Sequence, residues 1–360
     1  KTMSKRYSPV IAHHNARGTS LHYAAGKGPG REKAPFPQIQ LINKQEEPAT
    51  CNEVSRARKH SKKGGDFPEG LYVAVSRPED FFIVQSSRPE RVMLALTGKN
   101  AKYLLADNKP SLPFKPAEII LTLDPYFPQF ATKFPAQSKN GTDNVAQDIK
   151  RLAEKGYLQY ILNNPGHFSL FRDIRDKVKL IGGPWLYMFN SWSLSFIASL
   201  GVDGFVSPLE NNRQNLERTL GIKSRGSETH GRKRHGFSPL HSKFFITVFA
   251  WPPLFNIRAN ISPGLASFAD NKDEIFSLVT GHEGCRVYPQ KPFSIIDKIP
   301  FLKEAGFGRF IIDLSGQLLK KSDYRDLMRS VKESAPLPHS SRFNWKDGFY
   351  QNQNTTAGSS

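Results

Sequence analysis

Side chains that could serve as catalytic groups stand at the ends of three apolar, strand-like runs. His167 follows one such run, Glu210 follows a second, and Asp313 lies at the end of a third. Carboxyl and imidazole groups are the usual general acids and bases of enzymes. We therefore predict Glu210, His167 and Asp313 as the candidate catalytic residues.

Polar and aromatic side chains with the same placement form a candidate substrate-binding set, as at the rim of a ligand pocket. Its members are Asn163, Trp185, Tyr187, Asn190, Asn211, Arg213 and Arg258. Asparagine also caps helices, and Asn211 and Asn212 precede a helical stretch, so capping and binding are equally good interpretations of these asparagines. For His167, Glu210 and Arg258 together, function is favoured, because capping does not explain three ionisable groups at three strand ends.

Cysteine chemistry is limited, because Cys51 and Cys285 are the only two cysteines. They cannot form a disulfide scaffold or a four-cysteine metal site. His282 and Cys285 stand three residues apart, which suits a metal-ligand pair or a Cys/His nucleophile. Without a second pair this signal is weak, and a free cysteine is more often a small core residue. We predict no metal here, and we find no nucleophile elbow, His-Glu-x-x-His motif or phosphate loop.

Eight strand-like runs must position these groups, and helical stretches alternate with them. The runs are 71–76, 91–97, 117–123, 157–162, 178–182, 204–207, 243–250 and 309–314. The main helical stretches are 144–155, 168–176, 192–200, 212–220 and 295–305. This alternation predicts an α/β fold with a parallel sheet, and eight units match a (β/α)8 TIM-like barrel. A doubly wound open sheet is the alternative, but no Gly-x-Gly-x-x-Gly follows any run.

The predicted domain organisation has three parts. Residues 1–70 read as a basic linker or the end of a preceding domain, 71–335 as the barrel, and 336–360 as a tail. The chain has 360 residues and a formal charge of +19. Residues 1–70 contribute +7 and Lys223–Lys243 contributes +5. A solvated linker is the favoured interpretation of the first segment, whereas phosphate binding and a solvated insertion are equally good for the second.

The charge and hydropathy also bear on partners. A basic surface attracts phosphate-rich polymers, so RNA is an expected partner, beside a protein or peptide substrate. No apolar run approaches the roughly 20 residues that span a bilayer. We therefore expect no membrane partner and a cytoplasmic location.

Three segments resemble a known family. They are Asn163–His167 with Pro184–Asn190, Ser207–Leu216, and Phe343–Tyr350. Together they are similar to the collagenase-like peptidases (peptidase family U thirty-two) in their long bacterial form, over about residues 70–350. The resemblance implies a barrel-like fold and a protease activity. It also implies, as the favoured chemistry, RNA modification of the kind in which relatives hydroxylate transfer or ribosomal RNA.

Several relatives hold an iron–sulfur cluster on four cysteines, and here this chain departs from them. Arg258-Ala259-Asn260 stands where relatives have an arginine closely followed by a cysteine, and Cys285 is at most a vestigial ligand. The resemblance therefore leads us to expect no cluster and no other cofactor. The alternative function is a non-catalytic accessory barrel that has lost these ligands.

Overall fold

The computed structural model describes residues 67–108, 110–125, 143–211, 215–216, 243–257, 266–271, 273–281, 284–316, 318–338 and 340. Most of the predicted linker 1–70, most of the tail 336–360 and nearly all of Lys223–Lys243 lie outside these residues. Arg213 and Arg258 lie outside them as well. No helix in the described part of the chain is long and apolar enough to cross a membrane.

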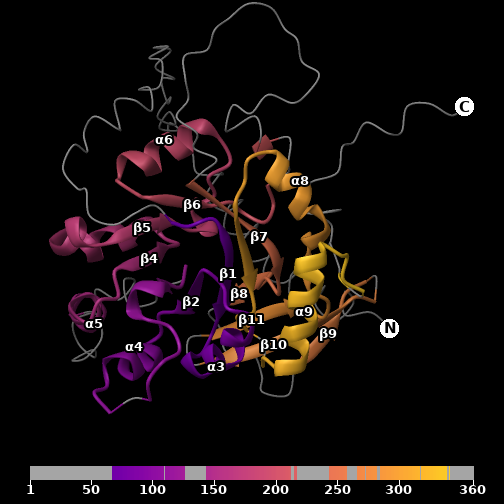
Figure 1. Ribbon diagram of the computed structural model, residues 1–360, viewed down its shortest axis with the longest axis horizontal. Helices are drawn as coiled ribbons and strands as arrows, with labels where there is room; N and C mark the ends of the chain where they lie inside the picture. Colours follow the sequence, from indigo (N-terminus) through magenta and orange to yellow (C-terminus); the bar gives the residue numbers. More distant parts are fainter. Residues whose placement is uncertain are drawn as a thin grey trace, which may run out of the picture.

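Eight parallel strands close into a barrel (Figure 1). They are β1 (Gly70–Val75), β2 (Arg91–Ala95), β3 (Ile119–Thr122), β4 (Gln159–Leu162), β5 (Lys179–Gly182), β6 (Gly204–Val206), β7 (Phe244–Ala250) and β13 (Arg309–Asp313). Neighbours in sequence pair in order, β13 joins β7 to β1, and β6 pairs with β7 to complete the ring. All eight strand-like runs are barrel strands, so the predicted (β/α)8 fold is confirmed.

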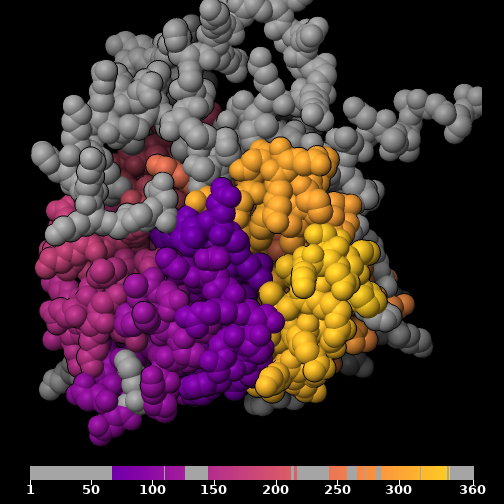
Figure 2. Space-filling model, viewed as in Figure 1, coloured from indigo at the N-terminus to yellow at the C-terminus, as the bar shows by residue number. Residues whose placement is uncertain are grey.

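Helices surround the barrel. The α-helices are α3 (Phe81–Val84), α4 (Gly98–Leu105), α5 (Asp143–Glu154), α6 (Ser191–Ser199), α8 (Ile299–Glu304) and α9 (Lys321–Glu333). The segment after β4, Pro165–Lys177, is a run of 3-10 turns, whose N-cap side chain, Asn164, accepts a hydrogen bond from the Gly166 amide at 2.8 Å. Helix α9 (yellow) lies beside the N-terminal part of the barrel domain (indigo) in Figure 2. There the Tyr324 hydroxyl donates a hydrogen bond to the Ser87 carbonyl at 3.0 Å.

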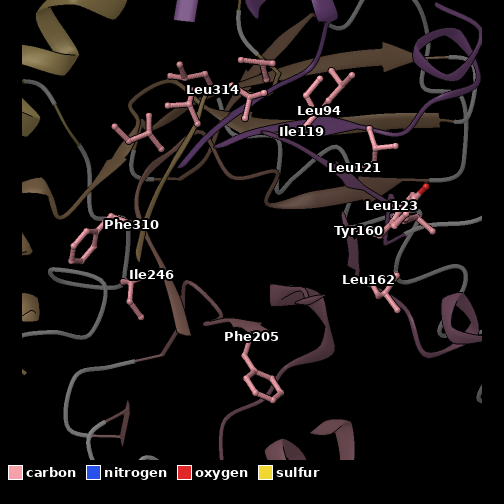
Figure 3. Close-up of a cluster of buried hydrophobic side chains, with 14 of the residues drawn as sticks. Leu94, Ile119, Leu121, Leu123, Tyr160, Leu162, Phe205, Ile246, Phe310 and Leu314 are labelled. Atoms are coloured by element: carbon pink, nitrogen blue, oxygen red, sulfur yellow. The ribbon is translucent and has the colours of Figure 1, made fainter. Parts of the chain in front are cut away.

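Alternate residues of each strand face opposite sides of the barrel wall. Outward side chains such as Leu94, Leu121 and Phe310 form the core between the strands and the helices (Figure 3). Inward side chains fill the lumen with one buried layer, which consists of Tyr72, Met93, Ile120, Ile161, Ile181, Val206, Phe245 and Ile311. Phe67 belongs to this inner cluster, so the packed barrel begins before residue 71.

A second sheet, which the sequence patterns did not predict, is inserted between β7 and β13. It consists of β8 (Phe255–Ile257), β9 (Ser267–Ala269), β10 (Ile275–Gly281) and β11 (Gly284–Pro289), in the order β8-β11-β10-β9. A short strand, β12 (Phe293–Ser294), then pairs antiparallel with β7. Cys285 is buried in the core of the inserted sheet beside Leu278 and Val287. The thiol is therefore a small core group, which is the interpretation of Cys285 that the sequence favoured.

Candidate functional site

At the carboxyl ends of four consecutive strands, the inward-facing side chains are partly exposed to solvent. Ala74 and Asp313 pair across β1 and β13, and Ala95 and Thr122 pair across β2 and β3. Each of these four residues stands two positions after a residue of the buried layer on the same strand, and therefore also faces inward. All four are partly exposed, whereas the outward-facing residue before each of them is buried. We call these four residues the barrel mouth. Three of its side chains are small, and the fourth is a carboxyl group.

Asp313 is the ionisable member of the barrel mouth. Its Oδ1 accepts hydrogen bonds from the Ser315 amide at 2.9 Å and from the Ser315 hydroxyl. Burial raises the pKa of Asp313, and the Ser315 hydrogen bonds oppose this rise without cancelling it. A carboxyl group with a raised pKa keeps its proton to higher pH and can act as a general acid.

The inserted sheet brings two further groups to this end of the barrel. Arg286 and Tyr288 alternate along β11 and so share one face of it. The Arg286 guanidinium pairs with Asp124, two residues beyond β3. The Tyr288 ring lies against Gly316, which has a φ of +86° and where a Cβ would come within 3.0 Å of that ring. The sheet therefore links the residues that follow β3 to those that follow β13.

Electrostatic interactions join these groups into one network. Burial raises the pKa of Tyr288, Arg286 lowers it, and the negative charges of Asp313 and Asp124 raise it further. For Arg286, burial lowers the pKa, but Asp124 and Tyr288 outweigh it and the net direction is upward. Tyr288 is thus held as a neutral hydroxyl beside a permanent cation. Neither residue had a sequence signal beyond its strand-like alternation, because the inserted sheet itself was not foreseen.

His167 is fully buried, with none of its surface exposed. Its Nδ1 accepts a hydrogen bond from the Asn163 amide at 3.3 Å. Burial lowers the pKa of His167 to about 4, against the opposing charge of Asp124. The imidazole is therefore neutral at physiological pH and does not reach solvent. We assign it as a positioning residue for the segment after β4 rather than as a group that touches substrate.

Two of the predicted binding asparagines are also buried. The Asn163 side chain donates to the Leu123 carbonyl at 2.8 Å and lies so close to Gly183 that any Cβ there would overlap it. Asn211 accepts from the Asn215 amide group at 2.7 Å. That same amide donates to the Phe189 carbonyl at 2.8 Å. Both asparagines hold the loops that follow the strands in place.

The remaining predicted residues lie after β5 and β6. Asn190 is the N-cap of α6, accepting from the Ser193 amide at 2.9 Å, so the capping interpretation applies to it. Tyr187 is 48% exposed, and its ring centroid lies 6.3 Å from that of Trp185. Burial, and then the charge of Glu210, raise the pKa of Tyr187, which places Glu210 near this ring.

Three carboxyl groups at the carboxyl ends of the strands are distributed around the barrel. Asp313 ends β13, Glu210 follows β6 two strands away, and Asp124 follows β3, three strands from each. With Arg286 as the single cation of this set, the site residues carry a formal charge of two negatives. Within the ranges given above, no group of three or more His, Cys, Asp or Glu side chains is placed to hold a metal ion.

No protein-family model matches the sequence, and no curated protein matches it. The spore cortex-lytic enzyme SleL of Bacillus cereus is similar in structure at 10% identity, with 78% of each chain covered and a TM-score of 0.34. The C-terminal domain of a putative chitinase from Desulfitobacterium hafniense DCB-2 is similar at 10% identity, with 74% of this chain and 90% of that one covered and a TM-score of 0.26. Such distant likenesses carry no argument about chemistry.

Proposed function

We propose that this protein is a hydrolase that cleaves a polymer by carboxyl acid–base catalysis at the barrel mouth. The observation that carries the proposal is Asp313, an inward-facing carboxyl group at the open end of the lumen whose pKa is raised by burial. Active sites of (β/α)8 enzymes lie at this end of the barrel. Paired carboxyl groups in different protonation states are the acid and base of many hydrolases.

In the proposed reaction, protonated Asp313 gives its proton to the leaving atom as the scissile bond breaks. A water molecule supplies the new bond to the other fragment, and its proton passes to a carboxylate at the same end of the barrel, Asp124 or Glu210. Proton exchange with solvent then restores both groups. Tyr288 and Arg286 supply the donor and the positive charge that stabilise negative charge in the transition state.

This chemistry suits peptide and glycosidic bonds, both of which are cleaved with a pair of carboxyl groups. The resemblance to the collagenase-like peptidases favours peptides as the first substrates to test. RNA modification is the second candidate, and the +19 charge favours it. The site residues, however, carry net negative charge, so an RNA backbone would be held by segments outside the mouth.

The test is a mass-spectrometric search for new chain ends after incubation of the full chain with gelatin, peptides, uncharged polysaccharides and RNA. We expect Asp313→Asn to lower turnover roughly 10²–10⁴-fold, the contribution of a general acid. Asp326→Asn, the same change on the outer face of α9, is the matched control and should retain full activity. Cleavage that survives Asp313→Asn, or no cleavage of any polymer, would overturn the proposal.

Glu210→Ala and Asp124→Asn separate the two candidate bases. Substitution of the carboxylate that accepts the proton from water should lower turnover as much as Asp313→Asn does. Substitution of the other carboxylate should lower it less. Retention of RNA on the protein at low salt with no cleavage of any polymer would instead support the second candidate. Full activity in a parent protein after the Asp313, Asp124 and Glu210 changes together would support the accessory barrel.

A further inference from the structure

The segment that follows β5 differs from the rest of the described barrel in containing no charged residue. From Gly182 to Val202 there is no Lys, Arg, Asp or Glu, although charged residues make up 23% of the chain. This stretch is nevertheless at the surface. Trp192 is 60% exposed and Phe196 is 63% exposed, both on α6. We call Tyr187, Trp192 and Phe196 the aromatic platform.

Packing of α6 against the barrel does not require these exposed rings. Leu194 and Ile197 are the buried residues of this helix and supply its inner face. Helix α9 shows the usual alternative, because it buries Tyr324 and Leu327 and exposes a charged outer face. Exposed apolar side chains that cluster on one surface mark an interaction site more often than chance.

One member of the aromatic platform, Tyr187, lies close enough to Glu210, a candidate base, for that charge to act on it. Tyr187 follows β5 closely, and its φ of 49° is a left-handed conformation seldom adopted by a residue with a side chain. Helix α6 begins at Ser191, near the carboxyl end of β5, so Trp192 lies towards that end and Phe196 about 6 Å further along the helix axis. Figure 1 shows α6 beside β5 and β6.

We infer that the aromatic platform binds an uncharged polysaccharide and guides it to the barrel mouth. The inference rests on the proposed hydrolase function, for which it names uncharged polysaccharide as the substrate class in place of the peptides that the resemblance favours. Aromatic faces stack on the apolar faces of sugar rings, and the exposed Ser191 offers a hydroxyl group to the sugar hydroxyls. A nucleic acid would require cations between the rings, and the stretch Gly182–Val202 that carries them contains none.

The experiment is native affinity electrophoresis of the full chain in gels that contain hydroxyethyl cellulose or glycol chitin. We expect retardation that is insensitive to salt, and about tenfold weaker binding in Trp192→Ala/Phe196→Ala, on the usual worth of aromatic contacts. Phe255→Ala is the matched control, because Phe255 is 62% exposed on the inserted sheet. It should bind as the unmodified protein does. Thermal unfolding of the double variant and of each single variant verifies that all three proteins are folded.

Three results would overturn the inference. The first is no retardation by either polysaccharide, and the second is equal loss of binding in Phe255→Ala. The third is that the platform serves another partner: a polyproline peptide binds instead, or self-association disappears in Trp192→Ala/Phe196→Ala. Asp313→Asn distinguishes this inference from the proposed function. If that variant binds polysaccharide but the unmodified protein cleaves no polymer of any class, the hydrolase proposal fails and the platform stands.

Discussion

The two ends of the barrel lumen are built from the same strands and differ in almost every property. At the carboxyl ends, the inward-facing Ala74, Ala95, Thr122 and Asp313 are partly exposed, and we call this the open end. At the amino ends, the inward positions hold long basic side chains, Arg91, Lys179 and Arg309. Phe67 closes this end: its ring packs edge-on against Phe245 at 5.5 Å, and the Lys179 Nζ lies 5.4 Å from its centroid.

Along each strand, every second residue faces the lumen. The inward-facing residues at the amino end contribute to stability, whereas we assign those at the carboxyl end to function. The closed end is held by specific bonds, because buried Arg309 donates to the Phe67 carbonyl and the Tyr72 hydroxyl donates to the Pro68 carbonyl at 2.6 Å. The open end leaves room and contains a carboxyl group whose charge is disfavoured. In (β/α)8 barrels, residues at the amino ends of the strands support the fold and those at the carboxyl ends carry the chemistry.

The largest effect that we expect on stability comes from His167, beneath the open end. Its pKa is about 4 in the folded protein against 6.5 when unfolded, so the unfolded chain binds a proton first as the pH falls. Stability is therefore lost between pH 6.5 and 4, by up to about 3 kcal/mol. Urea unfolding at several pH values should show this loss in the unmodified protein and not in His167→Gln. The same pH dependence in both proteins would refute the assignment.

The closed end should respond to Arg309→Met with a loss of about 2 kcal/mol, the usual worth of hydrogen bonds from a charged donor. Urea unfolding at neutral pH measures it. Because Arg309 lies at the far end of the lumen from Asp313, turnover per folded molecule should not change. A variant that keeps its stability but loses activity would contradict the division between the two ends.

Much of this architecture could be predicted from sequence, because buried parallel strands read as short apolar runs and each of the eight did so. The sequence also predicted that His167 and Asp313 stand where strands end, since each comes at or after the last residues of an apolar run; their catalytic roles stay predictions. Whether such a residue reaches solvent could not be predicted. Asn163, Asn164 and His167 all follow the same strand. Only the packing in the structure shows that Asn163 and His167 are buried whereas Asn164 is partly exposed.

The inserted sheet is the main feature that sequence reasoning missed. Its strands β8 and β9 have three residues each, too few to display alternation. Arg286 and Tyr288 meet Asp124 and Asp313 only through the fold, since more than 160 positions separate Arg286 from Asp124. Arg213 and Arg258, which sequence reasoning placed in the site, lie outside the described residues and stay predictions.

At the open end, we expect Asp313→Asn to stabilise the protein at neutral pH. A raised folded-state pKa means that the stability linked to this proton is complete below the unfolded pKa of about 3.9 and is lost as the pH rises through the folded value. Asparagine cannot ionise and avoids that loss. The difference in unfolding free energy between variant and unmodified protein should therefore grow with pH and then level off. If Asp313→Asn shows no such growth, Asp313 is not held protonated by burial.

The smallest change in stability should follow Arg286→Met, because the Arg286 and Asp124 side chains are 43% and 30% exposed. Ion pairs this accessible are worth about 0–1 kcal/mol. If the pair serves catalysis, turnover should fall about tenfold while KM for the cleaved polymer stays constant, since charge stabilisation acts on the transition state. Tyr288→Phe, which removes one hydroxyl group from the same network, should show the same split. A large fall in stability with unchanged turnover would instead make Arg286 a structural tie between the inserted sheet and β3, and the open end would then resemble the closed end more than we argue.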